Sequence, residues 1–204
     1  MQRRNLLKLA VTAVSGLISR PLLAKLNPTP AQTEGPFYPE KSQPDTDVDL
    51  TQIKGHKARA TGRVVQINGT VTDTKGQPLT NAQVEIWQAN HYGRYAHSRD
   101  GNPAQLDEHF QGWGIATTNA NGEYRFTTII PGAYPASRNW VRPPHIHYKI
   151  SHAKYRSLTT QMYFPEEPLN DKDLILNGLS PREQRKVIAK ASAKNQLRFD
   201  ITLA

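Results

Sequence analysis

Short β-favouring runs, each ended by a turn signal, fill the sequence from about residue 60 onward. In the run 82–87, Val84 and Ile86 alternate with Gln83 and Glu85. This two-residue period is typical of a strand with one buried face. Short strands at even spacing, joined by polar turns, are typical of an antiparallel sandwich. The sequence therefore predicts an all-β fold, an antiparallel β-sandwich with an irregular N-terminal arm and one short C-terminal helix.

The expected elements can be placed by residue number. Strands are predicted at 60–65, 69–72, 82–87, 115–118, 124–128, 146–151, 159–164 and 197–203. Asn121 and Gly122 lie between two of these runs and indicate a β-hairpin, because this pair favours a tight turn. Ser180 and Glu183 form a capping box around a first-turn proline, so a helix is expected from there to about Ala191.

Residues 1–24 have the layout of an export signal. A basic start, Arg3-Arg4, precedes an apolar stretch from Leu9 to Ile18. The stretch is too short to span a bilayer comfortably, and the arginine pair resembles a twin-arginine signal. We expect a twin-arginine-type signal peptide at 1–24, an N-terminal arm at 25–58 and a catalytic sandwich at 59–204. The protein would then be periplasmic or secreted, and the alternative is an uncleaved membrane anchor.

The absence of cysteine limits the chemistry of the chain. None of the 204 residues is a cysteine, which excludes disulfides, zinc–thiolate sites, iron–sulfur clusters and thiol catalysis. Any metal must therefore be held by His, Tyr, Asp or Glu. The formal net charge is +9, but no nucleic-acid-binding motif accompanies it, so we expect no nucleic-acid partner. A basic surface would help to attract an anionic substrate.

His145 and His147 are the sharpest local feature. Residues two apart in a strand point to the same face, so both imidazoles can reach one ion. Such a pair alone is only moderately specific, because two histidines on an exposed strand often bind nothing. Tyr95 and Tyr134 stand in glycine-containing loops before the pair, and each alone is more often an amphipathic core residue than a ligand.

Four segments together resemble the intradiol ring-cleavage dioxygenases, and among them most closely the iron-bearing β subunits of the protocatechuate 3,4-dioxygenases. The resemblance covers roughly residues 30–203 and keeps the family's order. The segments are Val-Glu-Ile-Trp-Gln-Ala-Asn (84–90), Gly-Arg-Tyr (93–95), Pro-Gly-Ala-Tyr-Pro (131–135) and Arg-Pro-Pro-His-Ile-His (142–147). Such an ordered set is far more specific than any one of its members.

The resemblance implies a non-haem Fe(III) site and a reaction. The metal ligands carried over by motif position are Tyr95, Tyr134, His145 and His147. The implied catalytic residues are Arg142, Gln161 and Tyr134. The implied reaction opens a catechol, such as protocatechuate, with O2 to a cis,cis-muconate. The implied partners are the small-molecule catechol and O2, in a homo-oligomer or with a partner subunit.

Two departures from the family pattern leave the substrate open. Ala136 and Ser137 occupy the stretch where the β-subunit pattern has a tryptophan, and the chain has no room for the helical N-terminal domain of catechol-specific relatives. A carboxylated substrate would need a cation near the pocket mouth, for which Arg94, Arg99 and Arg138 are candidates.

Two other readings compete with the enzyme. Segments such as 69–79 and 121–126 also occur in transthyretin-like β-sandwich binding modules, which are non-catalytic. Such a module would not require the two tyrosines and two histidines together. A cupin-type metal enzyme also uses a His-x-His pair, but it usually has a glutamate a few residues later, and here none appears until Glu166.

Overall fold

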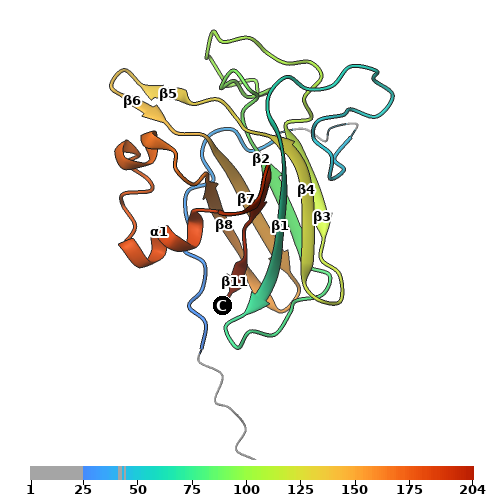
Figure 1. Ribbon diagram of the computed structural model, residues 1–204, viewed down its shortest axis with the longest axis vertical. Coiled ribbons are helices and arrows are strands. Elements are labelled where there is room, and N and C mark those ends of the chain that lie inside the picture. Colours follow the sequence, from blue (N-terminus) through green and yellow to red (C-terminus); the bar gives the residue numbers. More distant parts are fainter. Residues whose placement is uncertain (1–24, 41–42, 44) are drawn as a thin grey trace, which may run out of the picture.

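The computed structural model describes residues 25–40, 43 and 45–204, and the expected signal peptide lies outside this part of the chain. The described chain folds into two packed β-sheets with a small third sheet (Figure 1). The strands are β1 (Val64–Asp73), β2 (Gln83–Trp87), β3 (Trp113–Thr117), β4 (Glu123–Ile129), β5 (Tyr134–Ser137), β6 (Trp140–Arg142), β7 (His145–His152), β8 (Tyr155–Tyr163), β9 (Lys190–Ala193), β10 (Gln196–Arg198) and β11 (Ile201–Leu203).

The all-β prediction is confirmed. One sheet contains β1, β4, β9, β10 and β11, the second has the order β3-β2-β7-β8, and β5 pairs with β6. Most pairings are antiparallel, but β10 and β11 each pair with β1 in parallel. A 3₁₀ turn (Pro168–Lys172) and helix α1 (Pro181–Val187) precede β9. Within the described residues no helix is long and apolar enough to cross a bilayer.

The core lies between the two larger sheets. Val65, Ile67 and Val71 of β1 point inward, and Ile146 and Tyr148 of β7 meet them from the opposite sheet. The inward side chains on each strand are two residues apart, as the alternation in the sequence predicts.

The outer face of the four-stranded sheet is also buried, which is unusual for a strand with polar residues. Glu85, Trp87, His145, His147 and Gln161 lie on this face, and each is less than 9% exposed. The N-terminal arm covers this face, and the β5–β6 hairpin and α1 lie beside the sheet (Figure 1). This covered face therefore places polar side chains where a reaction could take place shielded from water.

The predicted hairpin at Asn121-Gly122 is wrong, although a tight turn does form there. Gly122 has φ +72° and its amide donates to the Asn119 carbonyl at 2.9 Å. The strands on either side join different sheets, because β3 pairs with β2 and β4 pairs with β1. The Gly122 carbonyl accepts from the Val71 amide of β1 at 2.8 Å, which draws the chain across the sandwich.

Other boundaries also differ from the prediction. The runs 60–65 and 69–72 form one strand, and the run 197–203 is split into two strands. The capping box at Ser180 is present, but α1 ends at Val187 instead of near Ala191. Beyond it, the Ala189 amide donates to the Tyr163 carbonyl of β8 at 2.9 Å. Pairing with the sheet therefore ends the helix early.

Candidate metal centre

Four side chains that the sequence singles out meet on the covered face of the four-stranded sheet. Tyr95 comes from the loop after β2, Tyr134 begins β5, and His145 and His147 belong to β7. The two imidazole rings lie 5.0 Å apart between centroids, the two phenol rings 5.6 Å, and Tyr95 and His147 6.3 Å. Each of the four residues is at most 8% exposed. The site is therefore a compact, nearly dry group of oxygen and nitrogen donors.

The strand β7 fixes both imidazoles. His145 lies opposite Tyr163 of β8, and His147 lies between Trp87 of β2 and Gln161 of β8. Trp87 stacks on the His147 ring at 4.9 Å with an interplanar angle of 12°. His145 Nδ1 lies 2.6 Å from the carbonyl of Pro143, which can only accept, so Nδ1 carries the proton. The Nε2 lone pair of His145 is therefore left facing the site.

Two glycines bring the tyrosine loops together. Gly93 has φ +80°, and a Cβ at this position would lie 2.4 Å from the Ala133 carbonyl oxygen. The Gly132 amide in turn donates to the Asn90 carbonyl at 2.9 Å. This backbone contact brings Tyr134 beside Tyr95, and the Tyr134 oxygen ends 3.4 Å from His145 Nε2.

Burial keeps all four groups uncharged in the absence of a cation. Desolvation, followed by the neighbouring Tyr134, raises the pKa of Tyr95 well above its usual range, and desolvation also raises the pKa of Tyr134. Desolvation, followed by the charge of Arg142, lowers the pKa of His147 to about 3 and that of His145 well below its usual range. A bound cation would reverse this for the phenols, because it favours their ionised form.

The donor set fits a hard, highly charged metal ion. The Tyr95 oxygen and His147 Nδ1 are buried with no hydrogen-bond partner among the described residues, and buried polar atoms usually have one. No cluster of three or more His, Asp or Glu side chains suited to a metal occurs in the described parts of the chain. A metal here would therefore depend on the phenol oxygens, which favour hard ions.

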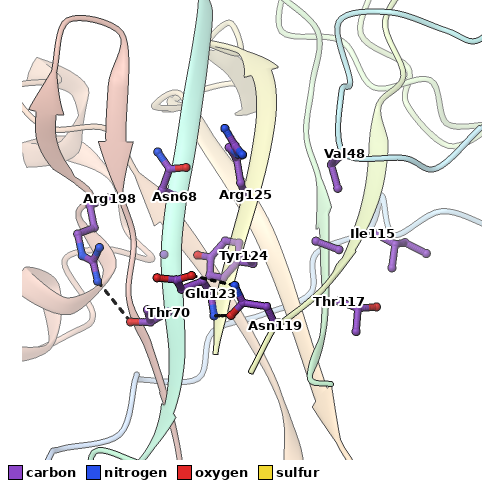
Figure 2. Close-up of a pocket in the computed structure, with 12 residues that line it drawn as sticks. Val48, Asn68, Thr70, Ile115, Thr117, Asn119, Glu123, Tyr124, Arg125 and Arg198 are labelled. Atoms are coloured by element: carbon purple, nitrogen blue, oxygen red, sulfur yellow. Dashed lines mark hydrogen bonds between the residues drawn. The ribbon is translucent and has the colours of Figure 1, made fainter. Parts of the chain in front are cut away.

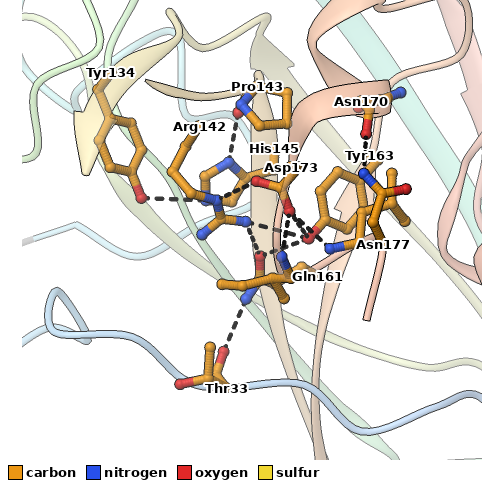
Figure 3. A network of polar contacts seen from close by, with 12 residues as sticks. Thr33, Tyr134, Arg142, Pro143, His145, Gln161, Tyr163, Asn170, Asp173 and Asn177 are labelled. Carbon is orange, nitrogen blue, oxygen red and sulfur yellow. Dashed lines mark hydrogen bonds and ion pairs between the residues drawn. The ribbon is translucent and has the colours of Figure 1, made fainter. Parts of the chain in front are cut away.

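A polar network lies directly beside the four donors (Figure 3). Arg142 Nε donates to the Asp173 carboxylate at 2.6 Å, and Arg142 Nη2 donates to the Gln161 side chain at 2.7 Å. The other end of the Gln161 amide donates to the Thr33 carbonyl of the arm at 3.0 Å. The structure thus brings both predicted polar residues, Arg142 and Gln161, next to the predicted ligands.

Two of the four donors, Tyr134 and His147, line a cleft of about 550 Å³, and Tyr95 and His145 lie beside them. Tyr134, Arg142 and His147 line it from below, and Gly35 and Trp140 line it from the arm and from β6. A second cleft of about 530 Å³ opens on the outside of β1, β3 and β4 (Figure 2). It is nearly as large but is lined by none of the six predicted site residues. The candidate functional cleft is therefore identified by the predicted metal-binding side chains that line it and not by its volume.

Sequence reasoning missed three residues of this site. Asp173 follows Arg142 by 31 residues and belongs to no motif, so only the fold reveals their pairing. Gly35 was visible only as part of the arm. Trp140 lines the cleft from β6, the strand that pairs with β5. It lies opposite Ser137, so a tryptophan is present close to the stretch where the β-subunit pattern has one.

Gly35 allows a direct test of how the arm supports the site. It has φ +73°, and a Cβ there would lie 3.2 Å from His147 Cε1. We expect Gly35→Ala to lower the affinity of the site for the ferric ion that the resemblance implies by about tenfold, because disturbing the residues that support metal ligands typically lowers metal affinity 10- to 100-fold. Gly55→Ala is the matched control, since Gly55 has φ +87° and no described atom within 4 Å of its Cβ position. Ferric titration should distinguish the two, and equal affinities would contradict the prediction.

The buried histidines predict an acid-sensitive metal-free protein. The pKa of His147 is lowered from 6.5 to about 3. At a pH between these two values, His147 is therefore protonated in the unfolded chain but neutral in the folded chain. Stability should therefore fall as pH drops below about 6.5, by at most about 1.4 kcal/mol per pH unit for this histidine. Urea midpoints at pH 7 and pH 5 measure this. The variant His147→Gln should show a smaller decrease, and an equal decrease would contradict the assignment.

Known proteins resemble the chain in sequence and in fold. A family model described as Dioxygenase matches residues 33–204. The protocatechuate 3,4-dioxygenase beta chain of Burkholderia cepacia is 40% identical over 160 residues, covering 77% of this chain and 68% of that one. The catechol 1,2-dioxygenase of Acinetobacter baylyi is 34% identical over 164 residues. The match covers 72% of this chain but only 50% of that relative.

Solved structures agree with these relatives. The dioxygenase domain of a dioxygenase carbohydrate-binding protein fusion from Streptomyces sp. SirexAA-E has a TM-score of 0.64 at 30% identity, covering 87% of this chain and 98% of that one. The 3-chlorocatechol 1,2-dioxygenase of Rhodococcus opacus 1CP has a TM-score of 0.67 at 22% identity, covering 87% of this chain and 73% of that one, and supports the fold alone.

Proposed function

Because the chain belongs to the intradiol ring-cleavage dioxygenase family, we propose that it is an Fe(III) enzyme that opens a catechol-type diol with O2 to a cis,cis-muconate. The single observation that supports this most strongly is the buried set of two phenols and two imidazoles, of which Tyr134 and His147 line a cleft. The Tyr95 oxygen in that set is buried and has no hydrogen-bond partner among the described residues, so a bound metal ion would satisfy it. A non-catalytic β-sandwich binding module would not require these four side chains together.

The proposed ligands are Tyr95, Tyr134, His145 and His147. Two ionised phenols and one hydroxide would balance three positive charges, and the neutral imidazoles would complete the shell. Ferric iron bound by these four residues would supply a Lewis-acid centre that makes a deprotonated catechol reactive toward O2. Burial makes this charge neutralisation necessary, because an uncompensated charge in a site without water has a high free energy.

The two tyrosines have different roles in this proposal. Tyr134 lines the cleft, whereas Tyr95 does not, so Tyr134 is the phenol that an entering catechol reaches. Its oxygen lies 3.4 Å from His145 Nε2. We assign Tyr134, in its ionised form, as the group that would accept a proton from a catechol hydroxyl, because desolvation favours the neutral phenol that results.

Arg142 would act on the substrate ring directly, and Gln161 would act through Arg142. Arg142 lines the cleft, and its guanidinium would stabilise negative charge that develops on the ring. Gln161 binds Arg142 with its oxygen and the Thr33 carbonyl with its nitrogen, so it acts as a positioning residue for the guanidinium.

The visible spectrum of the purified protein tests the proposal. Tyrosinate bound to Fe(III) should give a red-brown band that shifts when catechol is added, and muconate should accumulate in air with one O2 consumed per ring. A protein that stays colourless and inert after ferric reconstitution would contradict both the metal and the reaction.

Location and assembly are further parts of the proposal. The Arg3-Arg4 signal supports twin-arginine export of the folded protein to the periplasm or beyond. The beta-chain name of one relative supports an oligomer, made of identical chains or with a partner subunit. Fractionation of a producing cell and the mass of the purified protein in solution would test these two points.

A further inference from the structure

Apart from the proposed ligands Tyr134 and His147, much of the cleft lining is apolar. Pro103, Pro135 and Ile175 line it together with the rings of Phe37 and Trp140. These side chains come from the arm, from the loop after Asp100, from the β5–β6 hairpin and from the segment after Asp173. A ring substituent that points away from the metal ligands would therefore meet hydrocarbon and aromatic surface.

Arg142 is the only Lys or Arg among the described residues that line the cleft. Its Nε lies 2.6 Å from Asp173, which is fully buried, and the two side chains are at most 5% exposed. Gln161 and the Tyr163 hydroxyl occupy further positions around the guanidinium (Figure 3). A carboxylate on the substrate would have to compete with Asp173 for a charge that is already neutralised.

Asp100 adds a negative group to the same wall. One carboxylate oxygen accepts from the Tyr95 amide at 2.7 Å, and the other accepts from the Asn102 amide at 2.9 Å. These bonds hold the carboxylate in place at the edge of the cleft. Its charge would repel an anionic substituent that entered beside it.

The cations that the sequence offered for a carboxylated substrate lie elsewhere. Arg94 donates to the Ala104 carbonyl at 2.9 Å, and Arg99 pairs with Glu40 at 3.3 Å. Arg138 is exposed in the tip of the β5–β6 hairpin. None of the three is among the described residues that line the cleft.

We propose that this cleft selects catechols whose ring substituent is uncharged and apolar, and that it discriminates against a ring carboxylate such as that of protocatechuate. The inference rests on the proposed function and specifies the substrate class of the same site. A desolvated carboxylate without a partner is strongly disfavoured, whereas a methyl group in the same place gains from burial. This selectivity differs from the substrate named for the 40%-identical relative.

The test compares 4-methylcatechol with protocatechuate, which differ only in the substituent at one ring position. We expect kcat/KM of the ferric full-length protein to be at least about tenfold higher for 4-methylcatechol. Dissociation constants in the absence of O2 should show the same preference without turnover. A protocatechuate preference of the same size, in either measurement, would overturn the proposed selectivity.

A designed cation provides the second arm of the test. Ala136 is exposed and lines the cleft, so Ala136→Arg places a positive charge at the wall with little risk to folding. We expect it to raise kcat/KM for protocatechuate about tenfold, with a gain that salt weakens. Ala136→Gln is the matched uncharged control and should leave the substrate ratio near the wild-type value. Equal effects of the two variants would overturn the electrostatic argument.

The outcomes separate this inference from the proposed function. If 4-methylcatechol binds selectively but neither compound is cleaved, the ring-cleavage function fails and the selectivity holds. If protocatechuate is preferred and Arg138→Gln removes that preference, Arg138 supplies the missing cation, so the selectivity fails and the ring-cleavage function holds. If neither compound binds the ferric protein, both proposals fail.

Discussion

Tyr95→Phe is expected to abolish ring cleavage without weakening the fold. The Tyr95 hydroxyl is buried and has no hydrogen-bond partner among the described residues. We expect kcat/KM to fall by more than about 100-fold. Mutation of a residue that only supports a metal ligand typically lowers metal affinity or activity 10- to 100-fold, and loss of a ligand should lower it further. The free energy of unfolding of the metal-free protein should be unchanged or rise by about 1 kcal/mol, since an unsatisfied hydroxyl is removed.

Tyr124→Phe is the matched control for this result. Tyr124 is 5% exposed, and its hydroxyl donates to the Phe199 carbonyl at 2.6 Å, away from the metal centre. Removal of this hydroxyl should lower stability by about 1 kcal/mol and leave iron content and activity unchanged. The two variants thus predict opposite patterns in urea unfolding and in the visible band. A Tyr95→Phe protein that keeps its colour and activity would exclude Tyr95 as a ligand.

Asp173→Asn is expected to cause the largest loss of stability. Asp173 is fully buried, pairs with Arg142 at 2.6 Å, and accepts from the Ile175 and Leu176 amides at 3.0 and 2.7 Å. An asparagine keeps the size but leaves the buried guanidinium uncompensated, which typically costs about 3–5 kcal/mol. Urea unfolding of the metal-free protein measures this loss.

Asp171→Asn is the control, because Asp171 lies two residues earlier and is exposed. Its effect should stay within about 0.5 kcal/mol. A loss below about 1 kcal/mol for Asp173→Asn would show that Arg142 finds another partner or water. The same substitution also frees a positive charge beside the cleft, so the protocatechuate to 4-methylcatechol ratio of kcat/KM should rise in any variant protein that remains folded.

Local sequence rules predicted the parts of the fold and site that depend on neighbouring residues. His145 and His147 share a face because they are two apart in a strand, and the structure places their ring centroids 5.0 Å apart. The capping box at Ser180 formed because all its partners lie within four residues. The candidate ligands from three separate segments were placed by resemblance, since spacing alone does not bring Tyr95 to Tyr134.

Features that depend on distant contacts were not predictable in this way. The turn at Gly122 was correct, but the sheet that each flanking strand joins is decided by Val71, some fifty residues earlier. Short strands such as β5, which contains Pro135, carry too weak a pattern to detect. The partner of Arg142 is set by how the segment around Asp173 packs beside β8, and no local rule encodes that packing.

The arm also decides the order in which the site can assemble during synthesis. Thr29 exchanges two hydrogen bonds with Thr202 of β11, at 3.0 and 2.9 Å. A few residues further on, the same arm binds Gln161 and reaches His147 through Gly35. The contact at Thr29 can therefore form only after Thr202 has left the ribosome, later than all four proposed metal ligands. The arm would then pair first with β8, through Gln32 and Thr33, and its support of the proposed metal centre would be complete only when β11 has joined the sheet.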